Sequence, residues 1–256
     1  MLDISEDKMT YLPKLGGWIP DKFDSSTDRS FDFEFRDHVE KIEKSTYHLG
    51  SMGDSSSQVD LRKWCSPIED QGHIGSCVGN ATVGALEFLQ IRNGLPYEDL
   101  SRLFVYYNAR LMVQQQEKDE GAYINLAFGT LSSLGTCSEK KWPYDIEKVF
   151  LRPSWGSYRE AYPNKISSFY RITPDSSRDD MIKLALRAHH PVVFGMLVDQ
   201  AYQDYRGGIM SLPKSTRINP GGHAQVIVGY DENKSVWIIR NSWGSWWGDG
   251  GYALVP

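Results

Sequence analysis

One cysteine stands where the sequence predicts the start of a helix. Cys77 follows the glycine-containing turn 72–75 and Ser76, a residue type that favours the N-cap. Apolar residues at positions 78, 81, 85 and 89 recur at helical spacing, and Asn93-Gly94 supplies a stop signal. At a helix start, free backbone N–H groups and the helix dipole stabilise a thiolate, the form of cysteine that attacks carbonyl carbon. The pattern therefore predicts a nucleophile on the first turn of a helix.

A lone cysteine in an apolar helix is more often a small buried hydrophobic residue than a nucleophile. Two neighbouring features favour catalysis here. The glycines of the preceding turn allow a ligand to approach the backbone closely. Gln71, six positions before Cys77, can direct its side-chain amide at an oxyanion formed at the cysteine.

Three separated motifs resemble those of the papain-like cysteine peptidases. The segment Gln71-Gly72-x-x-Gly75-Ser76-Cys77 is similar to the active-site signature of that family. Gly221-Gly222-His223-Ala224 and Arg240-Asn241-Ser242-Trp243-Gly244 follow it in the family's order. The resemblance covers residues 59–252 and implies an α+β fold of two lobes. One lobe would be helical and the other β-barrel-like, with the active site in the cleft between them.

The resemblance also implies a role for each matching residue. Cys77 would attack as a thiolate, and His223 would pair with it as an imidazolium and then protonate the leaving amine. Asn241 would fix the orientation and tautomer of His223, and Trp243 would cover that hydrogen bond from water. Gln71 and the backbone N–H of Cys77 would form the oxyanion hole. Taken singly, the histidine and the asparagine would be a structural histidine and an ordinary turn.

Substrate-binding residues follow from the same resemblance. Gly121-Ala122-Tyr123 stands where family members carry a Gly-Gly-Tyr segment that pairs with the substrate backbone as an added strand. Tyr123, Gly195 and Ala224 would then line the second subsite, with room for a large apolar or aromatic side chain. The alternative is that Tyr123 belongs to the core.

Departures from the family pattern concern its cysteines. Ile74 replaces the usual disulfide cysteine and Val78 the usual tryptophan, which looks like a bacterial branch of the family. Catalysis requires Cys77 to stay free, which leaves Cys65 and Cys137 as one pair that could form a disulfide. The alternative is two unpaired small hydrophobic residues, since sequence does not establish the geometry of a bridge.

Composition limits the partners and cofactors. A net charge of −5 over 256 residues and a pI near 5.7 argue against nucleic acid or an anionic membrane as a partner. No Cys/His spacing matches a zinc site and no glycine loop matches a phosphate cradle, so we expect no cofactor and no metal. Residues 1–20 lack a secretory signal, so the protein is either intracellular or missing a leader. We expect the second case, an exported protein. We also expect a monomer that acts on proteins or peptides.

The chain changes character along its length. Residues 1–57 form a polar extension, in which 31–35 alternates like a short strand, 36–44 could form a charged helix and 50–57 is typical of a flexible linker. We place a domain boundary there, with the peptidase domain over 58–256. In that domain the patterns predict helices at 77–92, 100–111, 124–134 and 179–188, and strands at 191–198, 224–230, 236–240 and 252–255. Helices first and strands later indicate α+β architecture.

These patterns predict a cysteine endopeptidase that works through an acyl-enzyme. The alternatives are an acyltransferase or amidase with the same machinery, and a binding module that has lost activity. The extension suggests a zymogen, restrained until cleavage within about residues 45–58, because an exposed polar linker is a natural cleavage site. The competing hypothesis is a structural strap, in which Trp18 and Ile19 pack permanently on the domain.

Overall fold

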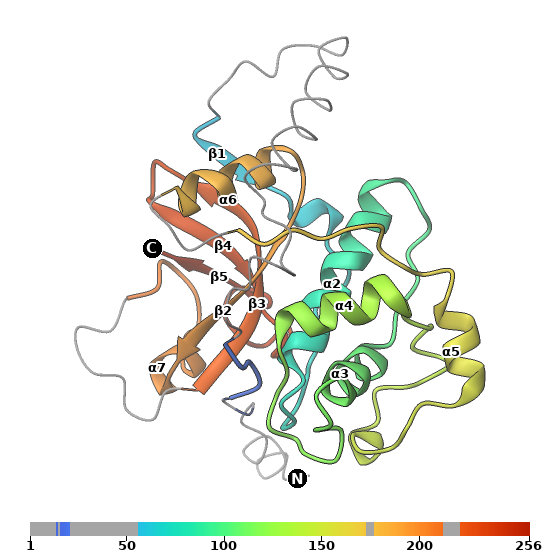
Figure 1. The fold of residues 1–256 in the computed structure, drawn as a ribbon. Coiled ribbons are helices and arrows are strands. Elements are labelled where there is room, and N and C mark those ends of the chain that lie inside the picture. Colours follow the sequence, from blue (N-terminus) through green and yellow to red (C-terminus); the bar gives the residue numbers. More distant parts are fainter. Residues whose placement is uncertain (1–13, 15, 21–55, 173–176, 212–220) are drawn as a thin grey trace, which may run out of the picture.

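A computed structural model describes residues 14, 16–20, 56–172, 177–211 and 221–256. The strand predicted over 31–35, the helix predicted over 36–44 and the linker residues 50–55 lie outside these ranges. The described part of the chain forms a helical lobe, followed by a lobe built on an antiparallel sheet (Figure 1). The predicted α+β, two-lobed fold is therefore confirmed.

The helical lobe is organised around α2 (Cys77–Arg92). Residues 77–88 are all buried, so the first three turns have no solvent face. A Cβ at Gly79 would lie 2.7 Å from the carbonyl oxygen of Arg102, and this glycine therefore lets α3 (Arg102–Leu111) pack directly on the α2 backbone. The remaining elements of this lobe are α4 (Ile124–Ser133), α5 (Trp155–Ala161) and the 3-10 turns η2 (Arg62–Trp64) and η3 (Ile146–Lys148).

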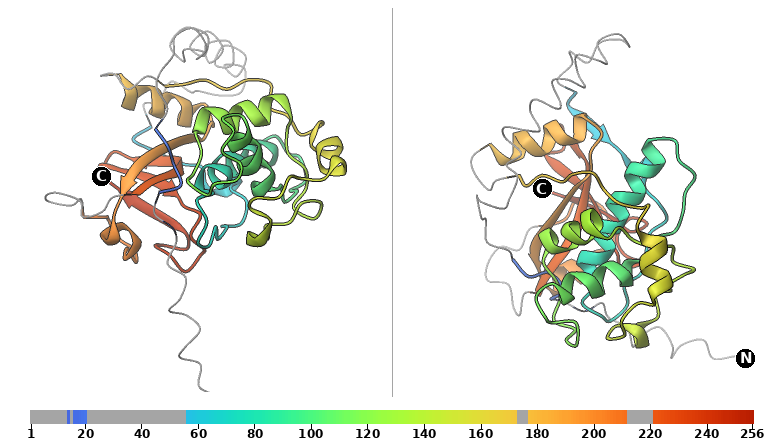
Figure 2. Two further views of the ribbon diagram at one scale, coloured as in Figure 1. Left: turned by 60° about the horizontal axis from the view of Figure 1, so that its bottom comes forward. Right: turned by 45° about the vertical axis from the view of Figure 1, so that its right-hand side comes forward.

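The second lobe is one antiparallel sheet, five-stranded among the described residues. Its strands are β1 (Gln58–Asp60), β2 (Val192–Val198), β3 (Gly221–Asp231), β4 (Val236–Arg240) and β5 (Tyr252–Val255), with α6 (Arg178–Arg187) and α7 (Gln200–Gln203) beside them (Figure 2). The central strand β3 pairs with β2 and then β1 along one edge and with β4 along the other, and β4 pairs with β5. A Cβ at Gly229 would overlap the carbonyl oxygen of Val59, so this glycine admits β1 to the sheet.

Most of the predicted elements are confirmed. β4 and β5 have the predicted bounds, and α4, α6 and β2 differ from the prediction by a single residue at their ends. The largest difference is at β3, which begins at Gly221 because residues 221–223 already pair with β2. His223 therefore lies within a strand, not in a turn before one.

The disulfide that Cys65 and Cys137 could have formed is not present, because all three cysteines are free. The physical reason is their separation in the fold. The Cys65 thiol lies beside Tyr252 and Arg240 of the sheet lobe, whereas the Cys137 thiol lies beside Ser157 of the helical lobe. The prediction of a bridge as one alternative is therefore wrong for this structure.

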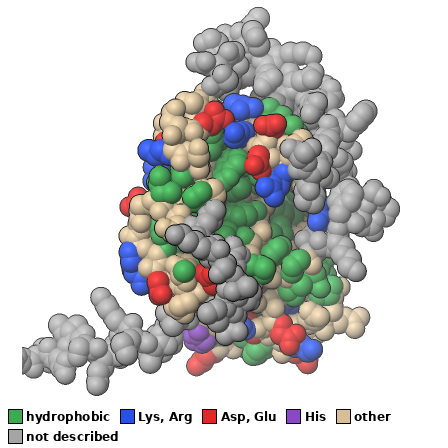
Figure 3. Space-filling model, turned by 90° about the vertical axis from the view of Figure 1, so that its left-hand side faces the viewer, with side chains coloured by type: hydrophobic (Ala, Val, Ile, Leu, Met, Phe, Trp, Pro, Cys, Tyr) green, Lys and Arg blue, Asp and Glu red, His purple; other side chains and the backbone are tan. Residues whose placement is uncertain are grey.

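A cavity of about 1060 Å³ lies between the lobes, bordered by α2, α4, β2 and the crossing segment 163–172. Figure 3 views the molecule from the side of the sheet lobe and shows hydrophobic side chains gathered along the middle of that face. Of the helices that the structure describes, none has the length and apolar character needed to cross a bilayer. The described ranges also contain no group of three or more His, Cys, Asp or Glu side chains that could hold a metal ion.

Candidate active site

Cys77 is the first residue of α2 and Ser76 is its N-cap, as predicted. The capping chemistry differs from the usual pattern, because the Ser76 side chain accepts no bond from the first turn. Its hydroxyl instead bonds the Tyr144 hydroxyl and the Asn80 amide. The first-turn N–H groups of Cys77 and Val78 are thereby left to the cysteine sulfur, which both contact.

The thiol and the imidazole are both fully buried. Burial raises the pKa of the Cys77 thiol to about 12, and hydrogen bonds from the backbone N–H groups of Ala224 and Val78 lower it only in part. The Ala224 N–H donates to Cys77 Sγ at 3.4 Å. Burial also lowers the pKa of His223 to about 4, against the bond from Asn241, which raises it. The covered site therefore favours a neutral thiol and a neutral imidazole, not the predicted thiolate–imidazolium pair.

His223 and Asn241 are joined across two strands of the sheet. The His223 Nε2 to Asn241 Oδ1 distance is 2.7 Å. The backbone N–H of Ser242 donates to the same Oδ1 at 2.8 Å, which fixes the orientation of the amide because a backbone N–H can only donate. Nε2 must then carry the proton of the neutral ring. Nδ1, which has no hydrogen-bond partner among the described residues, keeps its lone pair and can act as a base.

Trp243 covers this pair as predicted. Its ring is fully buried and stacks on the His223 ring, with centroids 4.5 Å apart and planes 26° apart. Tyr202 and Trp247 meet Trp243 edge to face, at centroid distances of 5.7 Å and 5.5 Å. The His223–Asn241 hydrogen bond therefore lies in a low-dielectric setting, where a hydrogen bond is stronger than in water.

Gln71 lies beside the same segment. Its Oε1 accepts from the Ser242 hydroxyl at 2.7 Å, and its Nε2 donates to the carbonyl of Ile74 at 3.1 Å. An amide nitrogen carries two N–H groups, so one remains for an oxyanion at Cys77. Ser242 thus sets which end of the Gln71 amide faces the nucleophile.

Residues 16–20, here called the cleft segment, lie over the nucleophile. A Cβ at Gly17 would lie 2.7 Å from Cys77 Sγ and 2.6 Å from the carbonyl oxygen of Gly75. The Gly17 carbonyl accepts from the Ala122 N–H at 3.1 Å, and the Ile19 N–H donates to the Ala122 carbonyl at 3.0 Å. The cleft segment therefore meets, through one parallel bridge between Trp18 and Ala122, the edge that the sequence analysis predicts to bind substrate.

The opposite wall of the cleft holds Trp18. Its backbone N–H donates to the Gly222 carbonyl at 3.0 Å. Its ring lies against Gly195, where any Cβ would overlap the indole, and it borders one end of the inter-lobe cavity. Two residues before the segment, the Lys14 ammonium pairs with the Asp119 carboxylate at 2.7 Å. Asp119 also accepts from the Gly75 N–H at 2.9 Å, beside the nucleophile turn.

Seven of the predicted residues meet at the cleft. Gly121, Ala122 and Gly195 contact the cleft segment, and the Ala224 N–H contacts the thiol of Cys77. His223 directly precedes Ala224 in β3, and Gln71 lies on the segment that leads to Cys77. Tyr123 is half-buried and is the N-cap of α4. His73, in the turn before the nucleophile, is exposed.

Sequence reasoning did not single out two residues at the site and one in the nucleophile helix. Ser242 orients Gln71, and Asp119 pairs with Lys14, just before the cleft segment. Glu87 lies fully buried in the nucleophile helix and forms an ion pair there. Ser242 stands inside a recognised motif, and a charged residue inside an otherwise apolar helix is a signal for a buried pair. Nothing local marks Asp119.

Comparisons with known proteins agree with this geometry. Residues 55–256 match the family model described as papain family cysteine protease. An uncharacterised peptidase C1-like protein of Acanthamoeba polyphaga mimivirus is 39% identical over 73% of this chain and 63% of its own length. Pro-cathepsin H of Mus musculus is 29% identical over 83% of this chain and 63% of its own length.

Solved structures show the same fold. Xylellain, a cysteine protease from Xylella fastidiosa, has a TM-score of 0.78 and 32% identity, covering 95% of this chain and 90% of its own. A Carica candamarcensis cysteine protease in complex with E-64 has a TM-score of 0.61 and 25% identity, covering 78% of this chain and 88% of its own.

The chain spans between 42% and 63% of the length of the first curated relatives that it matches. The matched region nevertheless includes both lobes and all residues of the cleft apart from the cleft segment. The match over most of the chain shows that the protein belongs to the papain family of cysteine proteases.

Proposed function

We propose that this protein is a cysteine endopeptidase in which Cys77, His223 and Asn241 act together. In the open cleft the Cys77 thiol gives its proton to His223 Nδ1, and the thiolate attacks the carbonyl carbon of a peptide bond. The proton then passes from the imidazolium to the leaving amine as the C–N bond breaks, which leaves a thioester on Cys77. Water, deprotonated by His223, hydrolyses the thioester and restores the thiol.

The surrounding residues support this sequence of steps. Asn241 Oδ1 holds the Nε2 proton of His223, which keeps Nδ1 available at the nucleophile. The tetrahedral intermediate would place its oxyanion between the Gln71 amide and the backbone N–H of Cys77. The observation that carries the proposal is the 2.7 Å His223–Asn241 bond beside a cysteine at a helix start.

The wall that holds Trp18 supports a preference for substrates with a large apolar or aromatic residue. Gly195 leaves the space that the indole fills, and the cavity continues beyond it. Ala122 offers both its backbone groups to an added strand. Peptides carrying tryptophan or phenylalanine at the position that contacts Gly195 should be cleaved faster than matched alanine peptides.

The full chain is proposed to be a zymogen. The cleft segment covers Cys77 and buries both reacting groups, which favours their neutral forms. Its pairing with Ala122 takes the backbone groups that a substrate would need. Pro-cathepsin H, a relative by sequence, is by its name a precursor, which agrees with this proposal. Cleavage within about residues 45–58 would separate the segment from the peptidase domain, for which we keep the boundary 57/58.

Activity is tested with the full chain and with a version beginning at Ser55, incubated with a dipeptidyl amide substrate and an epoxide inhibitor of cysteine peptidases. Ser55 is chosen because the Ser56 carbonyl accepts from the Tyr230 hydroxyl at 2.8 Å and should be retained. The shorter version should be folded, faster than the full chain and inhibited by the epoxide. Cys77→Ser should abolish hydrolysis in both.

Each hypothesis fails on a different result. Hydrolysis that survives Cys77→Ser contradicts the peptidase mechanism. A shorter version that is no faster than the full chain, or that unfolds, contradicts the zymogen and favours a permanent structural strap. Acyl transfer to an added amine in preference to water would point to the acyltransferase alternative.

Source, export and oligomeric state are separate proposals. The 32% identity to a Xylella fastidiosa enzyme supports a bacterial source, while the 39% identity to a mimivirus protein does not. Export of the protein as a monomer acting on proteins or peptides is kept as a proposal. Fractionation of the producing cells tests export, and sedimentation of the purified full chain tests the monomer.

A further inference from the structure

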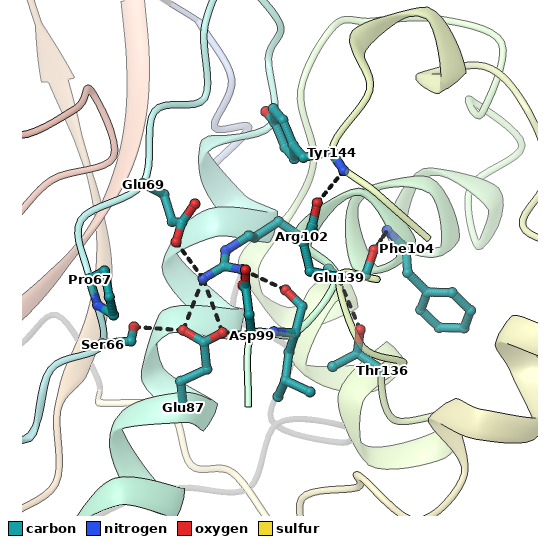
Figure 4. Close-up of polar contacts among 12 residues, drawn as sticks. Ser66, Pro67, Glu69, Glu87, Asp99, Arg102, Phe104, Thr136, Glu139 and Tyr144 are labelled. Carbon is teal, nitrogen blue, oxygen red and sulfur yellow. Dashed lines mark hydrogen bonds and ion pairs between the residues drawn. The ribbon is translucent and has the colours of Figure 1, made fainter. Parts of the chain in front are cut away.

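A cluster of charged side chains lies about 15 Å along α2 from Cys77. Figure 4 shows Glu87 and Arg102 facing each other in this cluster, with Glu69 and Asp99 beside Arg102. At its centre is Glu87, which is fully buried. Its carboxylate oxygens accept from the Ser66 hydroxyl at 2.6 Å, the Leu100 N–H at 2.9 Å and Arg102 Nη2 at 3.0 Å. Each oxygen has two donors, so the carboxylate is fully satisfied and fixes three neighbours on the nucleophile helix.

Arg102 connects this carboxylate to the segment that carries Gln71. Its Nη2 also meets Glu69 Oε1 at 2.9 Å, two residues before Gln71, and its Nη1 pairs with Asp99. The guanidinium is 1% exposed. Burial lowers its pKa, but the carboxylates of Glu87, Glu69 and Asp99 raise it above the ordinary value, so it stays charged.

Arg240 connects the same carboxylate to Asn241. It is the last residue of β4, directly before Asn241, and its side chain turns back toward α2. Its Nη2 donates to the Ser66 hydroxyl at 3.0 Å and to the Pro67 carbonyl at 2.7 Å. The Ser66 hydroxyl in turn donates to Glu87. One buried chain of bonds thus runs from the nucleophile helix to the strand that presents the orienting asparagine.

Backbone pairing joins the two connections. The Gln71 N–H donates to the Ser242 carbonyl at 2.9 Å, and the Gly244 N–H donates to the Glu69 carbonyl at 2.8 Å. Residues 69–71 and 242–244 are therefore held together as one unit by backbone pairing. Because the bonds at Glu87 are directional and shielded from water, a change there has no solvent to replace a lost partner.

We propose that Glu87, acting through Arg102 and Ser66, is a positioning residue for catalysis. It holds Cys77, which lies on its own helix, in register with Gln71 and Asn241, which come from the unit formed by residues 69–71 and 242–244. This inference rests on the proposed Cys77–His223–Asn241 mechanism.

The test is the Glu87→Gln substitution in the full chain. It is made once in the native chain and once together with Trp18→Ala, which is intended to open the cleft. The change keeps the size of the side chain and removes the charge that Arg102 and Arg240 share. Displacement of catalytic groups by a fraction of an ångström to 1 Å lowers rates by up to about a hundredfold, so kcat should fall by about 10- to 100-fold while KM changes little. A weaker Asn241 bond lowers the pKa of His223, and because His223 acts as a base in the proposed steps, the acid limb of kcat should move to lower pH.

Glu232→Gln is the matched control, because Glu232 forms an exposed ion pair with Lys183 at 2.8 Å, away from the cleft. It should change neither kcat nor the pH profile. Glu69→Gln should act in the same direction as Glu87→Gln and more weakly, and it provides a second variant if Glu87→Gln does not fold.

Double-mutant cycles separate positioning from loss of folded enzyme. All rates are expressed per active site, counted by titration with the epoxide. Glu87→Gln should then lower kcat by a smaller factor in an Asn241→Ala or Gln71→Ala background than in the native background. An equal factor in all backgrounds, an unchanged pH profile or a native kcat would overturn the inference. Native activity in Asn241→Ala itself would instead contradict the proposed mechanism.

Discussion

Gly17→Ala should activate the full-length protein. Gly17 lies against the Cys77 thiol and the backbone of Gly75, since its Cβ would be 2.7 Å from Cys77 Sγ and 2.6 Å from the backbone carbonyl oxygen of Gly75. Rotation of the Cys77 side chain would leave the overlap with the Gly75 backbone in place, so the cleft segment must shift. Gly17 is not among the residues with positive φ, and alanine can therefore adopt its backbone conformation. The overlap in the cleft is the whole cost of the change.

The size of the effect follows from that overlap. Forcing an extra methyl group into a packed site costs about 1–3 kcal/mol. Because about 1.4 kcal/mol is a tenfold change in an equilibrium, the ratio of covered to open molecules should fall by about 5- to 150-fold. Hydrolysis of a dipeptidyl amide by the full chain should rise by the same factor, up to the rate of the uncovered enzyme. Alkylation of Cys77 near pH 7 should accelerate in parallel, since hydration of the thiol lowers its pKa.

Gly129→Ala serves as the control for this prediction. Gly129 lies in α4, and its Cβ would make only an ordinary contact, 3.6 Å from Met112 Cε. It should leave hydrolysis and alkylation of the full chain unchanged. If Gly17→Ala also leaves both rates unchanged while the chain stays folded, the cleft segment does not restrain Cys77 and the reasoning is refuted.

Three further outcomes are expected. The covered form of the cleft should be most stable between about pH 6.5 and 9. Because the pKa of His223 is lowered in the covered form, that form loses stability as the pH falls from 6.5 toward about 4. Because the pKa of Cys77 is raised in the covered form, that form also loses stability as the pH rises from 9 toward about 12. The ratio of alkylation rates between Gly17→Ala and the native full chain should therefore be largest within that window, and a flat ratio would contradict the assignment. Ser242→Ala should lower kcat by about tenfold because it frees the Gln71 amide to turn away from the oxyanion, and steady-state kinetics of the opened chain would show this. Titration under denaturing, non-reducing conditions should find three free thiols, and a count of one would restore the Cys65–Cys137 bridge.

Short-range patterns in the sequence were enough to place the nucleophile and the sheet. Cys77 begins α2 where the serine before it and the run of helix-compatible residues after it predict, since such signals act within a few residues, although the Ser76 side chain makes no capping bond. β4 and β5 have their predicted bounds because β-branched and aromatic residues are bounded there by charged and glycine-rich turns. The order of the motifs then indicated which histidine and which asparagine belong with the cysteine.

The start of β3 was decided by pairing and not by local preference. Gly221-Gly222 favours a turn, yet these residues pair with Leu197 and Val198 of β2 and extend the strand through His223. A glycine pair in a strand is unfavourable by itself, but here Gly222 gives the space that the Trp18 backbone occupies. The contact with Trp18, which comes about two hundred residues earlier in the chain, offsets the unfavourable local conformation.

The state of the active site was likewise decided only by the tertiary structure. The helix start favours a thiolate, but the cleft segment, sixty residues earlier in the chain, buries Cys77 and raises its pKa. The sequence around Glu87 does not mark it as functional, because the proposed role depends on partners elsewhere in the chain. These are Ser66 and Arg102, which bond Glu87, and Arg240, which bonds Ser66. Helix and strand patterns depend on neighbours along the chain, whereas the charge of a catalytic group depends on which distant segments exclude water from it.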